Sequence, residues 1–129
     1  ILYISRKLSR HRRLLDEETL ISELRRRFPV TVVQLESLSY LEQMQLMQTV
    51  GIIVGPYGAG LTHVLFSKRQ GLVEIHNGDS KETHFMTLAL ASRCPYIRVQ
   101  GGKSRPNQDF ELGAYGIRAT VAAIDGLLN

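Results

Sequence analysis

Short apolar runs alternate with helix-like segments along the whole chain, and this rhythm limits the fold more than any other feature. The apolar runs occupy residues 1–5, 30–35, 51–54, 71–75 and 96–99, and the helix-like segments occupy residues 16–28, 39–50, 59–67, 81–92 and 117–128. A helix between two strands returns the chain to the same edge of a sheet, so such strands pair in parallel. We therefore predict one α/β domain over residues 1–129, a Rossmann-like, doubly wound, three-layer parallel sheet of about five strands.

Residue chemistry marks several helix ends. The segment at 16–28 begins with acidic residues and ends with Arg25, Arg26 and Arg27, which suits the helix dipole at both ends. Ser39 and Glu42 have the spacing of a capping box. Asp16 is expected to cap the helix that it begins.

Composition excludes several classes of protein. With 129 residues, 43% hydrophobic and 22% charged, the chain can bury a core, and it contains neither a signal-peptide pattern nor an apolar stretch of membrane-spanning length. It begins at Ile1 within a strand, so we expect a fragment of a longer protein. The single cysteine, Cys94, excludes an internal disulfide framework and a cysteine-based zinc site, and we expect it in the core.

The net charge of +4 is concentrated in one short stretch after the first strand. Its basic residues are Arg6, Lys7, Arg10, Arg12 and Arg13. Such a cluster attracts phosphate groups of any kind, whether of a nucleotide, a nucleic acid or a lipid. The alternative is a solvated surface loop.

A glycine-rich joint, GPYGAGLTH at residues 55–63, links the third strand to the helix after it. Gly58, Ala59 and Gly60 leave little side-chain bulk, so backbone N–H groups can approach an anion at the positive end of the helix, and Thr62 can add a hydroxyl. The spacing differs from the dinucleotide fingerprint and lacks a Walker lysine, so a sharp strand-to-helix turn is the alternative. Arg6, after the first strand, can bring a permanent charge to the same diphosphate.

Glu74 lies near the carboxyl end of the fourth strand, where a carboxylate can accept hydrogen bonds from ribose hydroxyls. The alternative is an edge residue that faces water. Three histidines, His63, His76 and His84, match no familiar zinc spacing, and we expect them in loops or on the surface, with no metal bound.

Several segments, in this order, resemble landmarks of glycosyltransferase family 61, which includes plant xylan arabinosyl- and xylosyltransferases, animal protein O-linked N-acetylglucosaminyltransferases and bacterial relatives linked to surface polysaccharides. The segments are residues 3–6 (YISR), 12–20 (RRLLDEETL), 42–43 (EQ), 54–62 (VGPYGAGLT), 65–66 (LF) and 73–75 (VEI). The resemblance extends from about Tyr3 to Tyr96.

This resemblance implies an inverting transferase with two Rossmann-like domains (GT-B type), of which the chain is similar to the carboxyl-terminal, donor-binding half. The implied donor is a nucleotide sugar, with UDP as the expected nucleotide, and the implied acceptor is a glycan or protein hydroxyl. No metal or other cofactor is required. The residues implied in binding the diphosphate and ribose are Arg6, Arg12 or Arg13, Tyr57, Gly58, Ala59, Gly60, Leu61, Thr62 and Glu74.

Two departures from the family pattern keep alternatives open. Tyr57 stands where the family usually has His, and His63 where Asn often follows Leu-Thr. We expect the general base outside this chain, so the fragment is predicted to bind donor without transferring it. The first alternative is a non-catalytic nucleotide-binding module. The second is a basic nucleic-acid-binding domain, although the chain has no recognition-helix signature and no aromatic stacking strand, and we predict no nucleic-acid partner.

Overall fold

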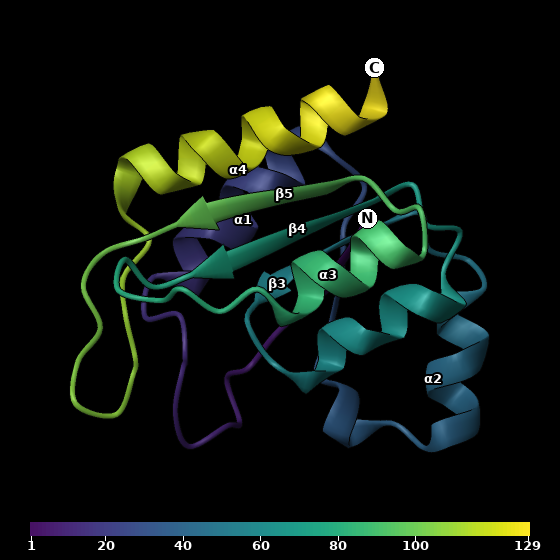
Figure 1. Ribbon diagram of the computed structural model, residues 1–129, viewed down its shortest axis with the longest axis horizontal. Coiled ribbons are helices and arrows are strands. Elements are labelled where there is room, and N and C mark those ends of the chain that lie inside the picture. The colour runs from purple at the N-terminus through teal and green to yellow at the C-terminus, as the bar shows by residue number, and fades with distance from the viewer.

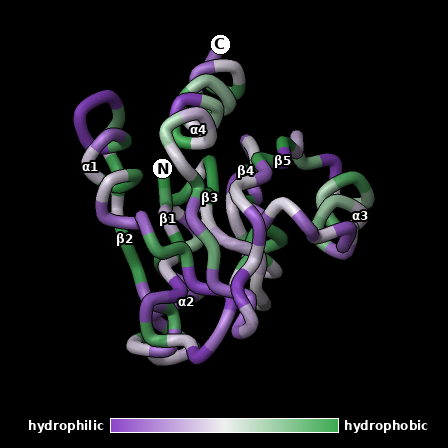
Figure 2. Tube along the Cα trace, turned by 90° about the vertical axis from the view of Figure 1, so that its left-hand side faces the viewer, coloured by the Kyte–Doolittle hydropathy of each residue, from purple (hydrophilic) through white to green (hydrophobic). Residues whose placement is uncertain are grey.

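Five parallel strands form one sheet in the computed structural model of the chain, which describes all residues except Ala59. The strands are β1 (Leu2–Ile4), β2 (Thr31–Val33), β3 (Ile52–Pro56), β4 (Gly71–His76) and β5 (Tyr96–Gln100). Their order in the sheet is β2-β1-β3-β4-β5, which Figure 2 shows as a row of strands from left to right. Every pair is parallel, so the predicted Rossmann-like α/β fold is confirmed.

Helices cover both faces of the sheet. The helices are α1 (Glu17–Arg27), α2 (Tyr40–Met47), α3 (His84–Ala91) and α4 (Gly113–Leu128), with two 3₁₀ helices, η1 (Leu35–Ser37) and η2 (Ala59–Phe66). In Figure 1, α4 lies above the strands, and α2 and α3 lie below them. The buried residues of α1 join the same cluster as those of α4, so these two helices cover one face. Among the described residues, no helix has the length and apolar character needed to cross a membrane.

The buried side chains form two hydrophobic clusters, one on each face of the sheet. Successive residues of a strand point to opposite faces. In β4, Val73 and Ile75 accordingly join the cluster that packs against α1 and α4, whereas Leu72 joins the cluster under α2, η2 and α3. Cys94 belongs to the second cluster at 3% exposure, which confirms its predicted place in the core.

Of two predicted helix caps, one is present in the structure and one is not. The capping box of α2 is present, with the Ser39 side chain accepting from the Glu42 N–H and the Glu42 carboxylate accepting from the Ser39 N–H. Asp16 makes no side-chain hydrogen bond to α1, so its predicted cap on that helix is wrong. Its carboxylate instead accepts from the N–H groups of Leu112 and Gly113 at the start of α4, both at 2.8 Å.

The chain reverses its winding direction between β1 and β3. From β1 it passes to β2 on one side, and then returns across β1 to β3 on the other. Gly55 permits the close pairing here, because a Cβ atom at this position would lie 2.7 Å from the Ile4 carbonyl oxygen. In open α/β sheets, ligands bind beyond the carboxyl ends of the strands at this kind of switch point. The loops after β1 and β3 are therefore the first place to look for a site.

Candidate functional site

A cavity of about 300 Å³ opens at the switch point. Its walls, which define what we call the switch-point cavity, include Ser5 and Arg6 after β1, Leu35 and Glu36 in η1, Gln43 in α2, and Gly58, Gly60, Leu61 and His63 after β3. Arg6 and the glycine turn, which were predicted to contact the same diphosphate, line this cavity together.

The Arg6 guanidinium lies directly against Gly58. A Cβ atom at Gly58 would overlap Nη1 of Arg6, so no larger residue fits here without moving the arginine. Nη2 of Arg6 donates to the His11 carbonyl at 3.2 Å, while its buried Nε has no hydrogen-bond partner among the described residues. Burial lowers the pKa of Arg6, the charge of Arg12 lowers it further, and Glu36 opposes the shift. A cation held beside a like charge is an arrangement that a bound anion would stabilise.

Arg12 joins Arg6, whereas Arg13 is engaged elsewhere. Arg12 has a left-handed backbone (φ 59°), its guanidinium lies 5.3 Å from the centre of the Tyr57 ring, and its buried Nε also has no partner among the described residues. Arg13 donates through Nε and Nη2 to one carboxylate oxygen of Asp109, at 3.1 and 2.8 Å. Burial raises the pKa of Asp109, but the bonds from Arg13 outweigh this effect and hold it below its usual value. Of the two arginines left open by the sequence, Arg12 is the one beside Arg6.

The predicted residues of the glycine turn have separate environments. The N–H of Leu61 donates to the Gly58 carbonyl at 3.0 Å as the turn of a 3₁₀ helix, so this predicted amide donor already has a partner. A Cβ atom at Gly60 would lie 3.0 Å from the Leu35 side chain. Thr62 is half-buried and is not among the residues that line the cavity. Ala59 lies outside the described residues.

A second cavity, of about 290 Å³, opens where the loops after β3, β4 and β5 meet. We call it the loop cavity; its lining includes Arg12, Tyr57, His76, Asn77, Ser80, Gln108 and Phe110. Amide, hydroxyl and aromatic groups of this kind suit a polar ligand with an apolar face. Arg6 lines the switch-point cavity and Arg12 lines the loop cavity, so each cavity has one of the two arginines in its wall.

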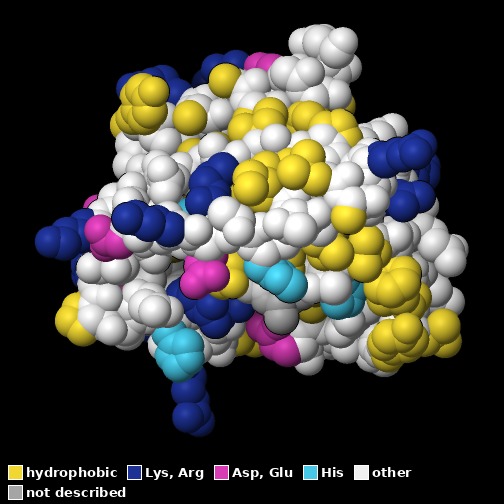
Figure 3. All heavy atoms as spheres, viewed as in Figure 1, with side chains coloured by type: hydrophobic (Ala, Val, Ile, Leu, Met, Phe, Trp, Pro, Cys, Tyr) yellow, Lys and Arg dark blue, Asp and Glu magenta, His cyan; other side chains and the backbone are white. Residues whose placement is uncertain are grey.

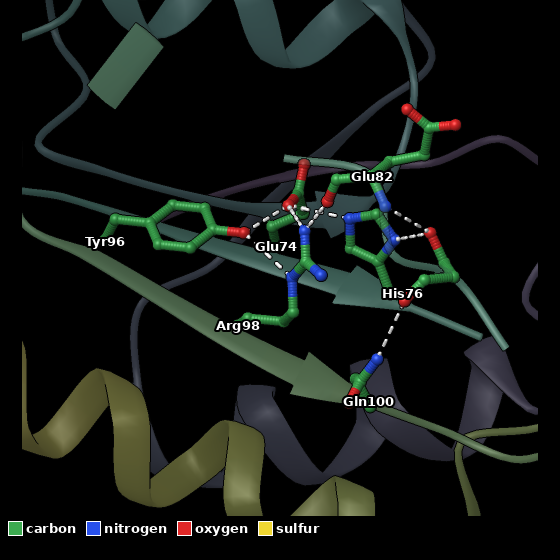
Figure 4. Close-up of polar contacts among 7 residues, drawn as sticks. Glu74, His76, Glu82, Tyr96, Arg98 and Gln100 are labelled. Carbon is green, nitrogen blue, oxygen red and sulfur yellow. Dashed lines mark hydrogen bonds and ion pairs between the residues drawn. The ribbon is translucent and has the colours of Figure 1, made fainter. Parts of the chain in front are cut away.

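Glu74 is fully buried in β4, with Tyr96, Arg98 and His76 around it (Figure 4). One carboxylate oxygen accepts from the Tyr96 hydroxyl and lies 2.7 Å from Nε2 of His76 and 3.6 Å from Nη2 of Arg98. Burial and the bond to Glu74 raise the pKa of Tyr96 to about 12. One carboxylate oxygen is thus engaged with internal partners, while the other has no hydrogen-bond partner among the described residues, and Glu74 lines neither cavity.

His76 is buried as well, contrary to the expectation of a loop or surface residue. It is 1% exposed, and its Nδ1 lies 2.7 Å from the hydroxyl of Ser80. Among the described residues, no three His, Cys, Asp or Glu side chains gather into a group that could hold a metal ion.

Sequence reasoning missed three residues that line the switch-point cavity, Glu36, Gln43 and His63. Glu36 follows β2, a position from which a carboxylate reaches the ligand in many nucleotide folds, so its place in the chain was an available signal. Gln43 lies in the EQ segment of the family resemblance and His63 in the glycine-rich joint, but neither segment indicates the contact between them, which depends on how α2 packs against η2.

Both basic and large hydrophobic side chains are exposed on the surface of the molecule. In Figure 3, several Lys and Arg side chains lie at the left and lower left, others lie at the top and right, and a group of hydrophobic side chains lies at the lower right. The exposed large hydrophobic residues of α2, η2 and α3 are Tyr40, Leu41, Leu65, Phe66 and Leu90.

Comparisons with known proteins add independent information. The profile of the family described as Glycosyltransferase 61 matches residues 1–73, more than half of the chain. An EGF domain-specific O-linked N-acetylglucosamine transferase from Drosophila melanogaster is 35% identical over 68 residues, which are 51% of this chain and 13% of that protein. The protein of the same description from Mus musculus is 32% identical over 92 residues, 67% of this chain and 17% of its own length. The chain therefore matches less than a fifth of either relative.

Proposed function

Because the chain belongs to glycosyltransferase family 61, we propose that it forms the donor-binding part of an inverting transferase that moves a sugar from UDP to a glycan or protein hydroxyl. In this proposal it is one half of a GT-B type pair of Rossmann-like domains. The two relatives named above are N-acetylglucosamine transferases, so UDP-N-acetylglucosamine is the first donor to test.

The observation that carries the proposal is the convergence of Arg6 and Arg12 beside Gly58 at the switch point. Each guanidinium has a buried Nε without a partner among the described residues, and the two charges are close enough to lower the pKa of Arg6. A diphosphate between them would accept from both. Fixed positive groups also stabilise the charge that develops on a departing nucleoside diphosphate, so the mechanism that we propose needs neither a metal nor a cofactor.

In this proposal, the two cavities define the orientation of the bound donor. We place the nucleoside in the switch-point cavity, against Leu35 and Leu61, and the sugar in the loop cavity, where Asn77, Gln108 and the Tyr57 ring lie. The diphosphate then spans from Arg6 to Arg12. The acceptor and the general base are assigned to the rest of the protein.

The ribose contact has two candidate carboxylates. The predicted one, Glu74, is fully buried and lines neither cavity, whereas Glu36 is exposed and lines the switch-point cavity. Comparing the donor affinity of Glu36→Gln with that of Glu74→Gln identifies which one binds the ribose.

Calorimetric titration of the chain with UDP and UDP-N-acetylglucosamine tests the donor site. We expect binding that weakens about tenfold or more in Arg6→Ala, which removes a charge-assisted contact, and in Gly60→Val, whose side chain would collide with Leu35. Arg25→Ala, an exposed change on α1, is the matched control and should bind as the wild type does. Equal affinity in all of these proteins would remove the basis for this site.

A non-catalytic nucleotide-binding module is the second candidate. It is favoured by Tyr57, which stands where the family usually has His and whose ring packs between Arg12 and His76. Transfer or hydrolysis of the donor by the intact protein would decide for the enzyme, whereas tight binding with no turnover would decide for the module.

A further inference from the structure

Gln43 on α2 makes contacts with both walls of the switch-point cavity. Its amide nitrogen donates to the carbonyls of Leu35 and Leu38, at 2.8 and 3.2 Å, at the wall formed by η1. Its Oε1 lies 2.8 Å from Nε2 of His63 in η2, and Nδ1 of His63 lies 3.1 Å from the Gly60 carbonyl oxygen. A continuous chain of polar contacts thus connects η1 with the glycine turn.

The hydrogen atoms in this chain can be assigned by counting donors and acceptors. Backbone carbonyls only accept, so Gln43 must present its NH₂ group to them and its oxygen to His63. Both ring nitrogens of His63 then face oxygen acceptors. A neutral imidazole has one N–H group and can satisfy one of these contacts, whereas the imidazolium satisfies both. Protonation of His63 therefore completes the chain and adds a positive charge to the cavity wall.

We infer that Gln43 and His63 are positioning residues for the donor, and that the protonated form of His63 holds η1 and the glycine turn at the spacing that admits a nucleoside diphosphate. The inference rests on the proposed function. It implies that donor affinity is higher at acidic pH than at basic pH, because the donor binds best to the form in which the His63 ring contacts both walls of the cavity.

The surroundings of this imidazole contain few other charges. Across the cavity, the charged side chains are Arg6 and Glu36, which have opposite signs. Of the elements packed against η2, β3 carries no titratable side chain, α2 carries Tyr40 and Glu42, and α3 carries His84, all three exposed. Substitution of the histidine therefore isolates its own contribution to the pH dependence.

UDP-N-acetylglucosamine is the probe for this test, because both of its phosphates are esterified and keep their charge, whereas the terminal phosphate of UDP titrates at about pH 6. Calorimetry on the chain should give about fivefold tighter binding at about pH 5.5 than at about pH 8. His63→Gln should bind equally at both pH values, with about the affinity that the wild type has at the higher pH. His84→Gln, an exposed change on α3, should keep the wild-type pH dependence.

Gln43→Leu provides the second variant, because leucine has a similar size and no polar atoms. It should bind the donor more weakly and also lose the pH dependence, a readout that a purely structural role would not change. Ring-nitrogen NMR should show both nitrogens of His63 protonated at the lower pH. An unchanged pH dependence in His63→Gln overturns the inference and leaves the donor site standing. A wild-type chain that binds no donor at either pH overturns the proposed function, and this inference with it.

Discussion

At the scale of single residues, Gly58 is required because of its neighbour rather than its backbone angles. Its φ of 173° is extended and open to any residue, but a Cβ atom would overlap the Arg6 guanidinium. Gly58→Ala should therefore displace the arginine without deleting its charge. We expect donor affinity to fall about tenfold, as for loss of a charge-assisted contact, when measured by calorimetry.

Gly126→Ala is the control for this prediction. The same substitution at this helical position meets open space, so it should leave donor binding unchanged and raise the free energy of unfolding slightly. Wild-type affinity in Gly58→Ala would show that the position of Arg6 is not important for the donor.

The buried carboxyl of Glu17 should make stability depend on pH. Burial raises its pKa above the ordinary value of 4.5, and the hydrogen bond from Ser5 offsets only part of this shift. Since the folded state binds the proton more tightly than the unfolded state, the resulting stabilisation is present at low pH and is lost as the pH rises through the raised pKa.

Glu17→Gln removes this titration. Urea unfolding from about pH 4 to about pH 8 should show the variant gaining stability relative to the wild type as the pH rises, with a constant difference once the wild-type carboxyl has ionised. A difference that does not change over this range would mean that the carboxyl has the same pKa in the folded and unfolded states.

At the scale of elements, α4 depends on a cap supplied from the other end of the chain. Asp16 accepts from two N–H groups at the start of α4. Asp16→Ala should lower the free energy of unfolding by about 1–2 kcal/mol, measured by urea unfolding. Asp125→Ala, an exposed change within α4, should have little effect. Equal losses in the two variants would contradict the capping role.

The elements themselves follow from the sequence to within a few residues, because hydrophobic spacing reports which face is buried. The largest differences are at helix ends: α4 begins at Gly113 rather than at residue 117, α2 ends at Met47 rather than at residue 50, and α3 begins at His84 rather than at residue 81. The preceding loop is held by distant partners instead, with Ser104 donating to Asp79 and Gln100 donating to the Ser80 carbonyl. Contacts of this kind leave no mark in the local sequence.

At the scale of the whole molecule, the two faces of the sheet should separate stability from binding. Leu24 is fully buried on the α1 and α4 face, away from both cavities, and Leu61 is 1% exposed and lines the switch-point cavity. Each change to alanine should cost about 2–5 kcal/mol of unfolding free energy. Only Leu61→Ala should also weaken donor binding. An equal loss of affinity in Leu24→Ala would mean that the faces are coupled.

The sequence predicted the meeting of Arg6 and Gly58 because both follow strands whose carboxyl ends share one edge of the sheet. It left Arg12 and Arg13 as equal candidates, since the choice depends on Asp109, a residue 96 positions away from Arg13. The partners of Glu74 were hidden for the same reason, because Arg98 is set opposite it by the register of β4 and β5. Local patterns report burial and turns, whereas pairing between distant polar groups needs the folded chain.

The hydrogen bonds between Asp16 and the start of α4 also affect folding during synthesis. A ribosome delivers residues in order, and these contacts join positions separated by 96 and 97 residues. The segment that carries Arg12 therefore acquires its final anchors only after the start of α4 has emerged. Contacts between such remote positions slow folding. The nascent polypeptide should stay unable to capture a nucleotide until α4 is free of the exit tunnel.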